Sequence, residues 1–198
     1  MALKPTKNIW FNGELVPWES AQIHVLSYAL HYGSAVFEGI RAYSTNNGTK
    51  IFRLDEHIKR LFNSAKIYRM NIAYNQQEIM EACKTIITTN ELNTGAYIRP
   101  IAFRGYNDLG LHASKDDDVE LVVAAWEWGT LLGADALENG VDVGVSSWNR
   151  NAPNTIPVMA KASGNYLSGT LVAIEAKENG YDEWICLDSD GFFSEVSG

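Results

Sequence analysis

The sequence has few cysteines and lacks clustered metal ligands. Its two cysteines, Cys83 and Cys186, lie far apart and belong to no CxxC or Cys/His cluster. This usage indicates neither a disulfide framework nor a zinc site, and we expect both thiols to be packed inside the protein. The four histidines are scattered as well, so the sequence predicts no metal centre.

Long apolar runs and clusters of basic residues are also missing. No apolar run approaches the roughly 18 residues of a membrane span, and the start, MALKPTKNIWFNG, lacks the apolar core of a signal peptide. We therefore expect a cytoplasmic protein with no membrane partner. The formal net charge of -8, without any stripe of lysine and arginine, argues against nucleic acid as a partner. Because 46% of the residues are hydrophobic and 20% are charged, we expect a globular protein that binds small molecules.

Turn signals and apolar periodicity predict an α+β first part. Asn12-Gly13 lies between apolar stretches and predicts a tight hairpin, and a turn at 46–48 predicts a second hairpin between strands at 36–43 and 50–52. Apolar residues at helical spacing predict a helix from Asp55, and a capping box at 75–78 predicts the start of another. We expect further strands at 96–103 and 119–126.

The second part begins after a connection expected at 129–133. The pattern predicts a strand at 141–147 and a hairpin around Asp190-Gly191. A helix is expected from about Tyr166, and one of its faces carries Leu167, Leu171 and Ile174. These features predict a small α+β domain over residues 1–128, a linker over 129–137 and the first part of a larger domain over 138–198.

Lys161 is the residue whose surroundings most suggest chemistry. It lies within WNRNAPNTIPVMAKASGNYLS, residues 148–168, among small residues that would let a planar ligand approach. A lysine attacks a carbonyl only as the neutral amine, and an ordinary pKa of about 10.4 leaves little of that form at pH 7. A nucleophilic lysine therefore needs a partly desolvated setting. Composition alone favours an ordinary solvated lysine.

The whole segment resembles the cofactor-lysine segment of the branched-chain amino acid aminotransferases, which are pyridoxal-phosphate enzymes of fold type IV. Further segments resemble that family in the same order, so that the resemblance covers the chain end to end: HYGSAVFEGIRAY at 31–43, FRLDEHIKRLFNSAKIYR at 52–69, AYIRP at 96–100 and FFSEVSG at 192–198. It implies a two-domain α+β fold with a complete small domain. Because family members continue well beyond residue 198, it also implies a C-terminally truncated large domain with open strand edges and apolar faces.

The resemblance implies roles for the residues of a cofactor site. Lys161 would form the Schiff base with pyridoxal phosphate and move the proton of the substrate Cα. Glu195 matches the carboxylate that pairs with the pyridine nitrogen, Tyr166 the tyrosine that donates to the phenolic oxygen, and Arg60 the arginine that binds the phosphate. The patterns alone favour plainer interpretations: a surface strand residue, a core aromatic residue and an exposed helix residue, respectively.

The resemblance also implies an apolar substrate slot. Phe37, Tyr97 and Trp128 would form it, with Tyr32 near a subunit interface, and such a slot favours leucine, isoleucine and valine. Tyr97 and Arg99 are two apart in a predicted strand and so share a face, which would let Arg99 accept the acidic side chain of glutamate. From composition alone, core packing is the favoured interpretation of Phe37 and Trp128.

The implied function is transamination between L-leucine, L-isoleucine or L-valine and 2-oxoglutarate, which yields glutamate and branched-chain 2-oxo acids. The implied cofactor is pyridoxal 5'-phosphate, and the implied assembly is a homodimer or higher homo-oligomer. D-amino acid aminotransferases and aminodeoxychorismate lyases share the fold and would reuse Lys161 and Glu195. A truncated, catalytically incompetent fragment that dimerises or binds partners is a further alternative. A metal-dependent hydrolase lacks the necessary ligand spacing.

Overall fold

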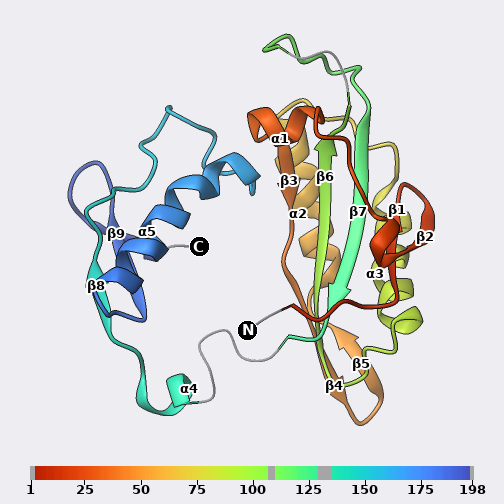
Figure 1. Cartoon of the computed structure of the whole chain (residues 1–198), viewed down its shortest axis with the longest axis horizontal. Coiled ribbons are helices and arrows are strands. Elements are labelled where there is room, and N and C mark those ends of the chain that lie inside the picture. The colour runs from red at the N-terminus through yellow and green to blue at the C-terminus, as the bar shows by residue number, and fades with distance from the viewer. Residues whose placement is uncertain (1–2, 107–109, 129–134, 197–198) are drawn as a thin grey trace. The chain divides into compact units, whose positions relative to one another are not determined.

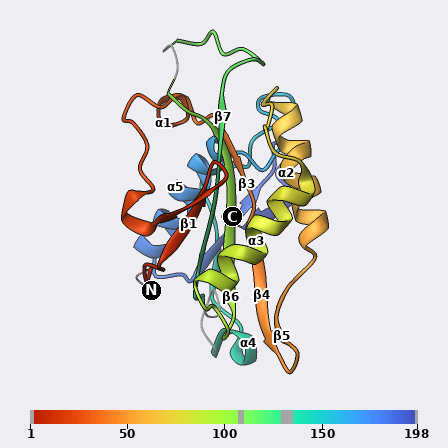
Figure 2. The same ribbon diagram turned by 90° about the vertical axis from the view of Figure 1, so that its right-hand side faces the viewer.

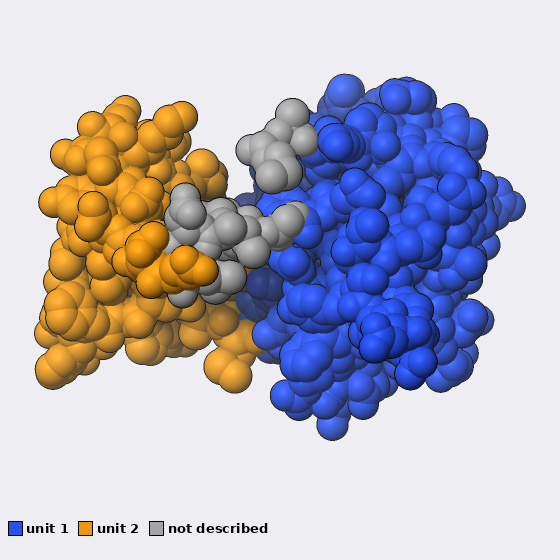
Figure 3. All heavy atoms as spheres, turned by 90° about the horizontal axis from the view of Figure 1, so that it is seen from below, with its two compact units in different colours: residues 1–129, 160–162 blue, residues 130–159, 163–198 orange. Residues whose placement is uncertain are grey.

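The computed structural model describes residues 3–106, 110–128 and 135–196. The chain forms two compact units, coloured separately in Figure 3: unit 1 comprises residues 1–129 and 160–162, and unit 2 comprises residues 130–159 and 163–198. Both units contain helices and strands, which confirms the α+β prediction. The expected connection at 129–133 lies outside the described residues, and a short helix, α4 (Asp135–Asn139), follows it.

Unit 1 is built on an antiparallel sheet with the strand order β2-β1-β7-β6-β4-β5, in which β3 also pairs with β6 (Figure 1). The described strands are β1 (Asn8–Phe11), β2 (Glu14–Pro17), β3 (Ala35–Phe37), β4 (Ile40–Thr45), β5 (Gly48–Ile51), β6 (Ala96–Arg104) and β7 (Val119–Trp126). The predicted hairpin at Asn12-Gly13 is confirmed. Both turn residues have positive φ, 46° and 97°, as a two-residue hairpin turn of this kind requires.

The second predicted hairpin is confirmed as β4–β5, but the strand before it is interrupted. β3 and β4 pair with successive parts of β6, and the regular ladder breaks at Glu38-Gly39. Across this break the Glu38 backbone N–H still donates to the Pro100 carbonyl at 2.9 Å. The break gives residues 38 and 39 a backbone geometry that the strand pattern did not predict.

Two helices, α2 (Leu54–Ile67) and α3 (Gln76–Thr89), pack on one face of this sheet (Figure 2). Their apolar stripes are buried in the core as the helical spacing predicts, and include Ile58, Leu61, Ile79, Cys83 and Ile86. The capping box is confirmed. Asn75 Oδ1 accepts from the Glu78 backbone N–H at 3.0 Å, and Glu78 Oε2 accepts from the Asn75 backbone N–H at 2.7 Å.

The alternation along β6 separates the two faces of the sheet. Ala96, Ile98 and Ala102 are buried in the core beneath the helices. Tyr97 and Arg99 are only partly buried, and because successive side chains of a strand point to opposite faces, they lie on the face away from α2 and α3. This second face, which we call the open face, carries most of the predicted substrate residues. A short helix, α1 (Tyr28–Tyr32), precedes β3 and ends at Gly33.

Unit 2 contains a three-stranded sheet in the order β10-β9-β8, where β8 (Val143–Val145) pairs parallel with β9 (Glu183–Leu187) and β10 (Phe193–Val196) pairs antiparallel with it. The hairpin predicted at Asp190-Gly191 is therefore confirmed. Helix α5 (Leu167–Glu178) packs on β9, and its core residues Val172 and Ala176 lie with Trp184 and Cys186.

The buried side of α5 differs from the face suggested by its large apolar residues. Leu167, Leu171 and Ile174 are exposed, whereas the buried positions are Gly169, Val172 and Ala176. Small side chains let a helix approach a strand closely, so compact residues rather than leucines make the contact with β9.

Both cysteines are buried free thiols, which confirms that they are packed residues. Burial raises the pKa of the Cys83 thiol to about 12 and also raises the pKa of Cys186. Among the residues that the structure describes, none of the helices combines the length and apolar character needed to cross a membrane.

Candidate active site

The backbone around Lys161 is attached to unit 1, although residues 159 and 163 on either side belong to unit 2. The Lys161 backbone N–H donates to Ser64 Oγ on α2 at 3.0 Å, and the Lys161 carbonyl accepts from the Phe37 backbone N–H at 3.0 Å. Ala162 also forms an antiparallel bridge with Val36 of β3. Residues 160–162 thus extend the sheet of unit 1 by one short segment, which we call the lysine clip.

The side chain of Lys161 points away from the core of unit 1. Ala160 and Ala162 are almost fully buried in that core. Because side chains alternate along an extended segment, Lys161 takes the opposite direction, and its Nζ lies 5.1 Å from the centroid of the Phe37 ring. In its protonated form, a lysine amine over an aromatic face is stabilised by the ring quadrupole. The partly buried amine therefore lies beside the first of the predicted substrate residues.

Four of the five predicted substrate residues form one cluster on the open face. The guanidinium carbon of Arg99 lies 4.6 Å from the Phe37 ring centroid and 5.2 Å from that of Tyr97. Arg99 Nη2 donates to Tyr97 Oη at 2.9 Å. The rings of Tyr97 and Trp128 lie 5.3 Å apart at 35°. Phe37, Tyr97, Arg99 and Trp128 are therefore linked in one cluster, and the strand spacing that placed Tyr97 with Arg99 agrees with this geometry.

Trp126 belongs to the same cluster and was missed by the sequence analysis. It pairs with Tyr97 across β6 and β7, and the two rings are 5.2 Å apart. Its indole Nε1 and the Nε of Arg99 are both buried and have no hydrogen-bond partner among the described residues. Buried donors normally find acceptors, so this face offers two N–H groups to an acceptor that the described residues do not supply. Alternation along β7 was the available signal.

Gly39 is a second residue that the sequence analysis did not single out. A Cβ at this position would lie 2.0 Å from Tyr97 Oη and 2.7 Å from Tyr97 Cζ. Both distances are far below van der Waals contact, so only glycine leaves room for the tyrosine in its observed place. The Glu38-Gly39 break in the ladder thereby shapes the open face.

Arg60 lies on α2 and is held by Glu38, a residue that the sequence analysis did not predict to be functional. Glu38 is fully buried and accepts from Arg60 Nε at 2.5 Å and from Arg60 Nη2 at 2.6 Å. Glu38 Oε2 also lies 2.8 Å from His57 Nδ1. The Arg60 side chain remains 52% exposed, so its guanidinium is held at one edge and reaches solvent elsewhere.

Tyr32 stands apart from the aromatic cluster. It is the last residue of α1, its side chain is exposed, and its ring lies 4.6 Å from that of Tyr28. A second ring contact of Tyr32 is with His31. Both of these contacts are local to α1.

Tyr166 and Glu195 belong to unit 2. Tyr166 is partly buried at the start of α5, where its carbonyl accepts from Thr170 Oγ1 at 3.3 Å. Glu195 on β10 is 62% exposed and forms an ion pair with Arg150, whose backbone N–H donates to the Leu187 carbonyl. Arg150 thus ties the predicted ring-nitrogen carboxylate to β9.

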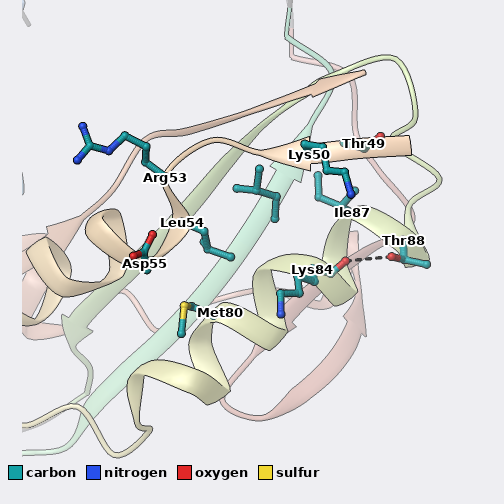
Figure 4. A pocket seen from close by; sticks show the side chains of 10 residues that line it. Thr49, Lys50, Arg53, Leu54, Asp55, Met80, Lys84, Ile87 and Thr88 are labelled. Atoms are coloured by element: carbon teal, nitrogen blue, oxygen red, sulfur yellow. Dashed lines mark hydrogen bonds between the residues drawn. The ribbon is translucent and has the colours of Figure 1, made fainter. Parts of the chain in front are cut away.

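A separate depression of about 530 Å³ lies on the helix side of unit 1 (Figure 4). It is formed by β5, the start of α2 and one side of α3. Its lining combines the cationic residues Lys50, Arg53 and Lys84 and the acidic Asp55 with apolar side chains and two threonines. The predicted site residues do not line this depression, so it is distinct from the cluster on the open face.

Comparison with known proteins places this geometry in a family. Residues 35–198 match the family model described as Amino-transferase class IV. The branched-chain-amino-acid aminotransferase of Escherichia coli (strain K12) is 52% identical over 198 residues, which cover 100% of this chain and 64% of that protein. The enzyme of the same name from Pseudomonas aeruginosa is 46% identical over 190 residues, 96% of this chain and 61% of its own length.

Solved structures agree with this comparison. The crystal structure of the E. coli branched-chain amino acid aminotransferase has a TM-score of 0.94 at 52% identity and covers 98% of this chain and 63% of its own. A T.th. branched-chain amino acid aminotransferase complexed with N-(5'-phosphopyridoxyl)-L-glutamate has a TM-score of 0.92 at 44% identity and covers 100% of this chain and 63% of its own. The chain thus spans a little under two thirds of the length of these relatives. The match over most of its residues, with Lys161 clipped beside Phe37 in unit 1, shows that the chain belongs to the class IV aminotransferases.

Proposed function

We propose that the full-length protein containing this chain is a pyridoxal-phosphate-dependent transaminase that exchanges the amino group between L-leucine, L-isoleucine or L-valine and 2-oxoglutarate. The observation that carries the proposal is the position of Lys161, whose Nζ lies 5.1 Å from the Phe37 ring beside the Tyr97–Arg99 pair. The 52% identity to a branched-chain-amino-acid aminotransferase over the whole chain supports the substrate class.

The residues present fit pyridoxal 5'-phosphate by their chemistry. Lys161 offers an amine for its aldehyde and Arg60 a half-exposed guanidinium for its phosphate. Tyr166 offers a phenol for its phenolic oxygen, and Glu195 a carboxylate for its ring nitrogen. When bound, the cofactor supplies an electron sink that loosens the Cα proton of an amino acid. The ion pair with Arg150 supports this role because it holds the Glu195 carboxylate beside a fixed cation.

The chain's own residues would handle the proton and the substrate side chain. The Lys161 amine would take the proton from the substrate Cα and return it, as a positioned general base and acid. Phe37, Tyr97 and Trp128 would form an apolar wall that excludes water and favours branched side chains. Tyr32, at the end of α1, is proposed as a further substrate residue near a subunit interface.

Arg99 is proposed to bind the carboxylate of the acidic side chain of glutamate and 2-oxoglutarate through its N–H donors. Its Nε and the neighbouring Trp126 Nε1 are buried donors without acceptors among the described residues, and a carboxylate supplies acceptors. The same wall would then accept either an apolar or an acidic side chain, as the two half-reactions of a transaminase require.

The absorption spectrum of the full-length protein tests the function. After incubation with pyridoxal phosphate and desalting, we expect the protein to retain the near-ultraviolet and visible absorption band of lysine-bound pyridoxal phosphate. Addition of L-leucine should replace this band with that of the pyridoxamine form. Lys161→Ala should lose both the band and turnover while unit 1 stays folded. Wild-type turnover in Lys161→Ala would remove the lysine from the mechanism, and conversion by D-leucine alone would favour a D-amino acid aminotransferase.

The organisation of the full-length protein is a further part of the proposal. We propose a small domain over residues 1–128, a linker over 129–137 and a cofactor-binding domain from residue 138, assembled as a homodimer or higher homo-oligomer in the cytoplasm. The division of this chain into two compact units supports the two domains of this proposal. Light scattering of the purified full-length protein tests the assembly, since a monomeric mass would contradict it.

A further inference from the structure

Ser64 is a buried residue of α2 that contacts the lysine clip directly. Its side chain is fully buried, and its Oγ accepts from the Lys161 backbone N–H at 3.0 Å, across 97 positions of sequence. This hydrogen bond is partly buried, and an N–H that loses its acceptor away from water carries a cost of desolvation, so the hydroxyl stabilises the backbone position of Lys161.

The Ser64 contact is one half of a two-sided attachment. The Lys161 carbonyl accepts from the Phe37 backbone N–H at 3.0 Å, so α2 binds the amide on one side of Lys161 and β3 binds the carbonyl on the other. The buried methyl groups of Ala160 and Ala162 fix the neighbouring positions in the core. Together these contacts fix the direction in which the Lys161 side chain leaves the backbone.

The position of Ser64 along α2 links this attachment to Arg60. The two residues are four apart and so lie on the same side of the helix, about one turn of roughly 5.4 Å from each other. Arg60 in turn is held by the buried Glu38. Helix α2 therefore carries both the hydroxyl that binds the Lys161 backbone and the arginine that Glu38 holds.

We propose that Ser64 is a positioning residue that aims Lys161 at the aldehyde carbon of the cofactor. The inference rests on the proposed function, in which the neutral Lys161 amine condenses with that aldehyde, so that a carbon–nitrogen double bond forms and one water leaves. Ser64 takes no part in this bond. It acts through the backbone of Lys161, and it should therefore affect only ligands that form a bond with the lysine.

Two cofactor forms separate this role from a general structural one. Pyridoxal phosphate carries the aldehyde, whereas pyridoxamine phosphate has the same ring and phosphate but cannot bond to Lys161. In the full-length protein, Ser64→Ala should weaken retention of pyridoxal phosphate by roughly tenfold or more, because the Lys161 N–H loses its acceptor. Affinity for pyridoxamine phosphate, measured by calorimetry, should stay within about twofold of wild type.

Ser27→Ala is the matched control. Ser27 is also buried in unit 1, but its Oγ has no hydrogen-bond partner among the described residues, so the same chemical change there removes no contact to the clip. Both variants should be compared by thermal unfolding. If Ser64→Ala does not fold, Ser64→Cys carries the test, since its sulfur is a weaker acceptor and should give an intermediate loss of pyridoxal phosphate.

The outcomes are distinct. If Ser64→Ala weakens the binding of pyridoxal phosphate and pyridoxamine phosphate equally, the inference is overturned, because Ser64 would then support the whole site. It is also overturned if Ser64→Ala binds both cofactor forms as Ser27→Ala does. Lys161→Ala measured in parallel separates this inference from the function on which it rests. If Lys161→Ala retains the wild-type absorbance, the proposed function fails. If Ser64→Ala retains the wild-type absorbance and Lys161→Ala loses it, the proposed function stands and the positioning role of Ser64 is rejected.

Discussion

Gly39 permits the arrangement of Tyr97 and Arg99, and its substitution should disturb both. In Gly39→Ala the new methyl would sit 2.0 Å from Tyr97 Oη, so the ring must move and the Arg99–Tyr97 hydrogen bond must lengthen. The ring is rigid and packed against Trp126 and Trp128, which leaves it little freedom to yield. We expect kcat/KM of the full-length protein with glutamate to fall about tenfold or more in steady-state kinetics.

A double-mutant cycle with Tyr97→Ala provides the control for Gly39→Ala. Without the ring the methyl meets no obstacle, so adding Gly39→Ala to Tyr97→Ala should change kcat/KM little further. Additive losses would show that Gly39 acts through the backbone rather than through Tyr97.

Cys83 should be inert towards thiol reagents in the folded protein. Burial raises its pKa to about 12, and only the thiolate reacts, so at pH 8 Cys83 should react with dithionitrobenzoate only after unfolding. Because the folded pKa lies above the unfolded one, the stability contributed by the protonated thiol is present below pH about 9 and is lost as the pH rises from about 9 to about 12. A Cys186→Ser background isolates the signal, and rapid reaction in that background would contradict the buried position.

Sequence spacing predicted some contacts of these residues, whereas others depend on tertiary packing and could not be predicted. The two-residue spacing of Tyr97 and Arg99 predicted a shared face, and the structure shows the hydrogen bond between them. The environment of Arg60 could not be predicted in this way, because Glu38 is 22 positions away and meets it only when β3 and α2 pack together. Their functional roles stay predictions until the variants are measured.

Helix α2 is the element that joins the core of unit 1 to the cluster of charged groups around Glu38. Glu38 is fully buried and contacts Arg60 and His57, both on α2. Glu38→Ala leaves these two partners without this acceptor, and we expect the free energy of unfolding in urea to fall by about 1.5–3 kcal/mol, the range of a lost hydrogen bond to a charged group, because the half-exposed Arg60 can be solvated instead.

Glu56→Ala is the control for that change. Glu56 lies on the same helix but is exposed and pairs only with the exposed Arg53 among its ion-pair contacts in the described residues. Its removal should leave the urea midpoint nearly unchanged, because exposed ion pairs contribute little. Similar midpoints for the two variants would mean that the Glu38 contacts do not stabilise unit 1.

At the scale of helices and strands, short sequence patterns correctly predicted the turns and caps that neighbouring residues determine. The hairpin turns and the capping box are confirmed because the residues that specify them are adjacent in sequence. The buried side of α5 was not predictable in this way. Its larger apolar residues suggested one face, but the contact with β9 is made by Gly169, Val172 and Ala176, and only the packing partner decides this.

At the scale of the whole molecule, one pocket wall is proposed to bind both apolar and acidic side chains. This proposal predicts that substitution of Arg99 affects only the half-reaction with glutamate. Arg99→Met keeps much of the length of the side chain but removes its charged donors. We expect kcat/KM with glutamate to fall about 10- to 150-fold, the range of a lost charge-assisted hydrogen bond, and the value with L-leucine to change less than about threefold. Single-turnover spectra of the full-length protein with each amino donor separate the two half-reactions.

Arg53→Met is the matched control for Arg99→Met, because Arg53 is an exposed arginine that pairs with Glu56. It should leave both half-reactions unchanged. Equal losses with glutamate and L-leucine in Arg99→Met would instead show that Arg99 supports the whole site rather than the acidic side chain.

The resemblance predicted the fold of the whole chain, and the match to class IV aminotransferases confirms it. It did not predict that residues 160–162 pack with unit 1, because the order of segments along a chain says nothing about a contact between positions 64 and 161. That contact depends on tertiary packing, which only the structure displays.

The lysine clip also determines when unit 1 can be completed during synthesis on the ribosome. Val36 and Ala162 are joined by an isolated antiparallel bridge, so unit 1 reaches its final form only after residue 162 has left the ribosome. Chains grow at about 5–20 residues per second, so roughly 2–7 s separate the emergence of residue 129 from that of residue 162. During this interval the core of the nascent unit lacks Ala160 and Ala162. The segment that carries Lys161 is thus the last part of the chain to join unit 1.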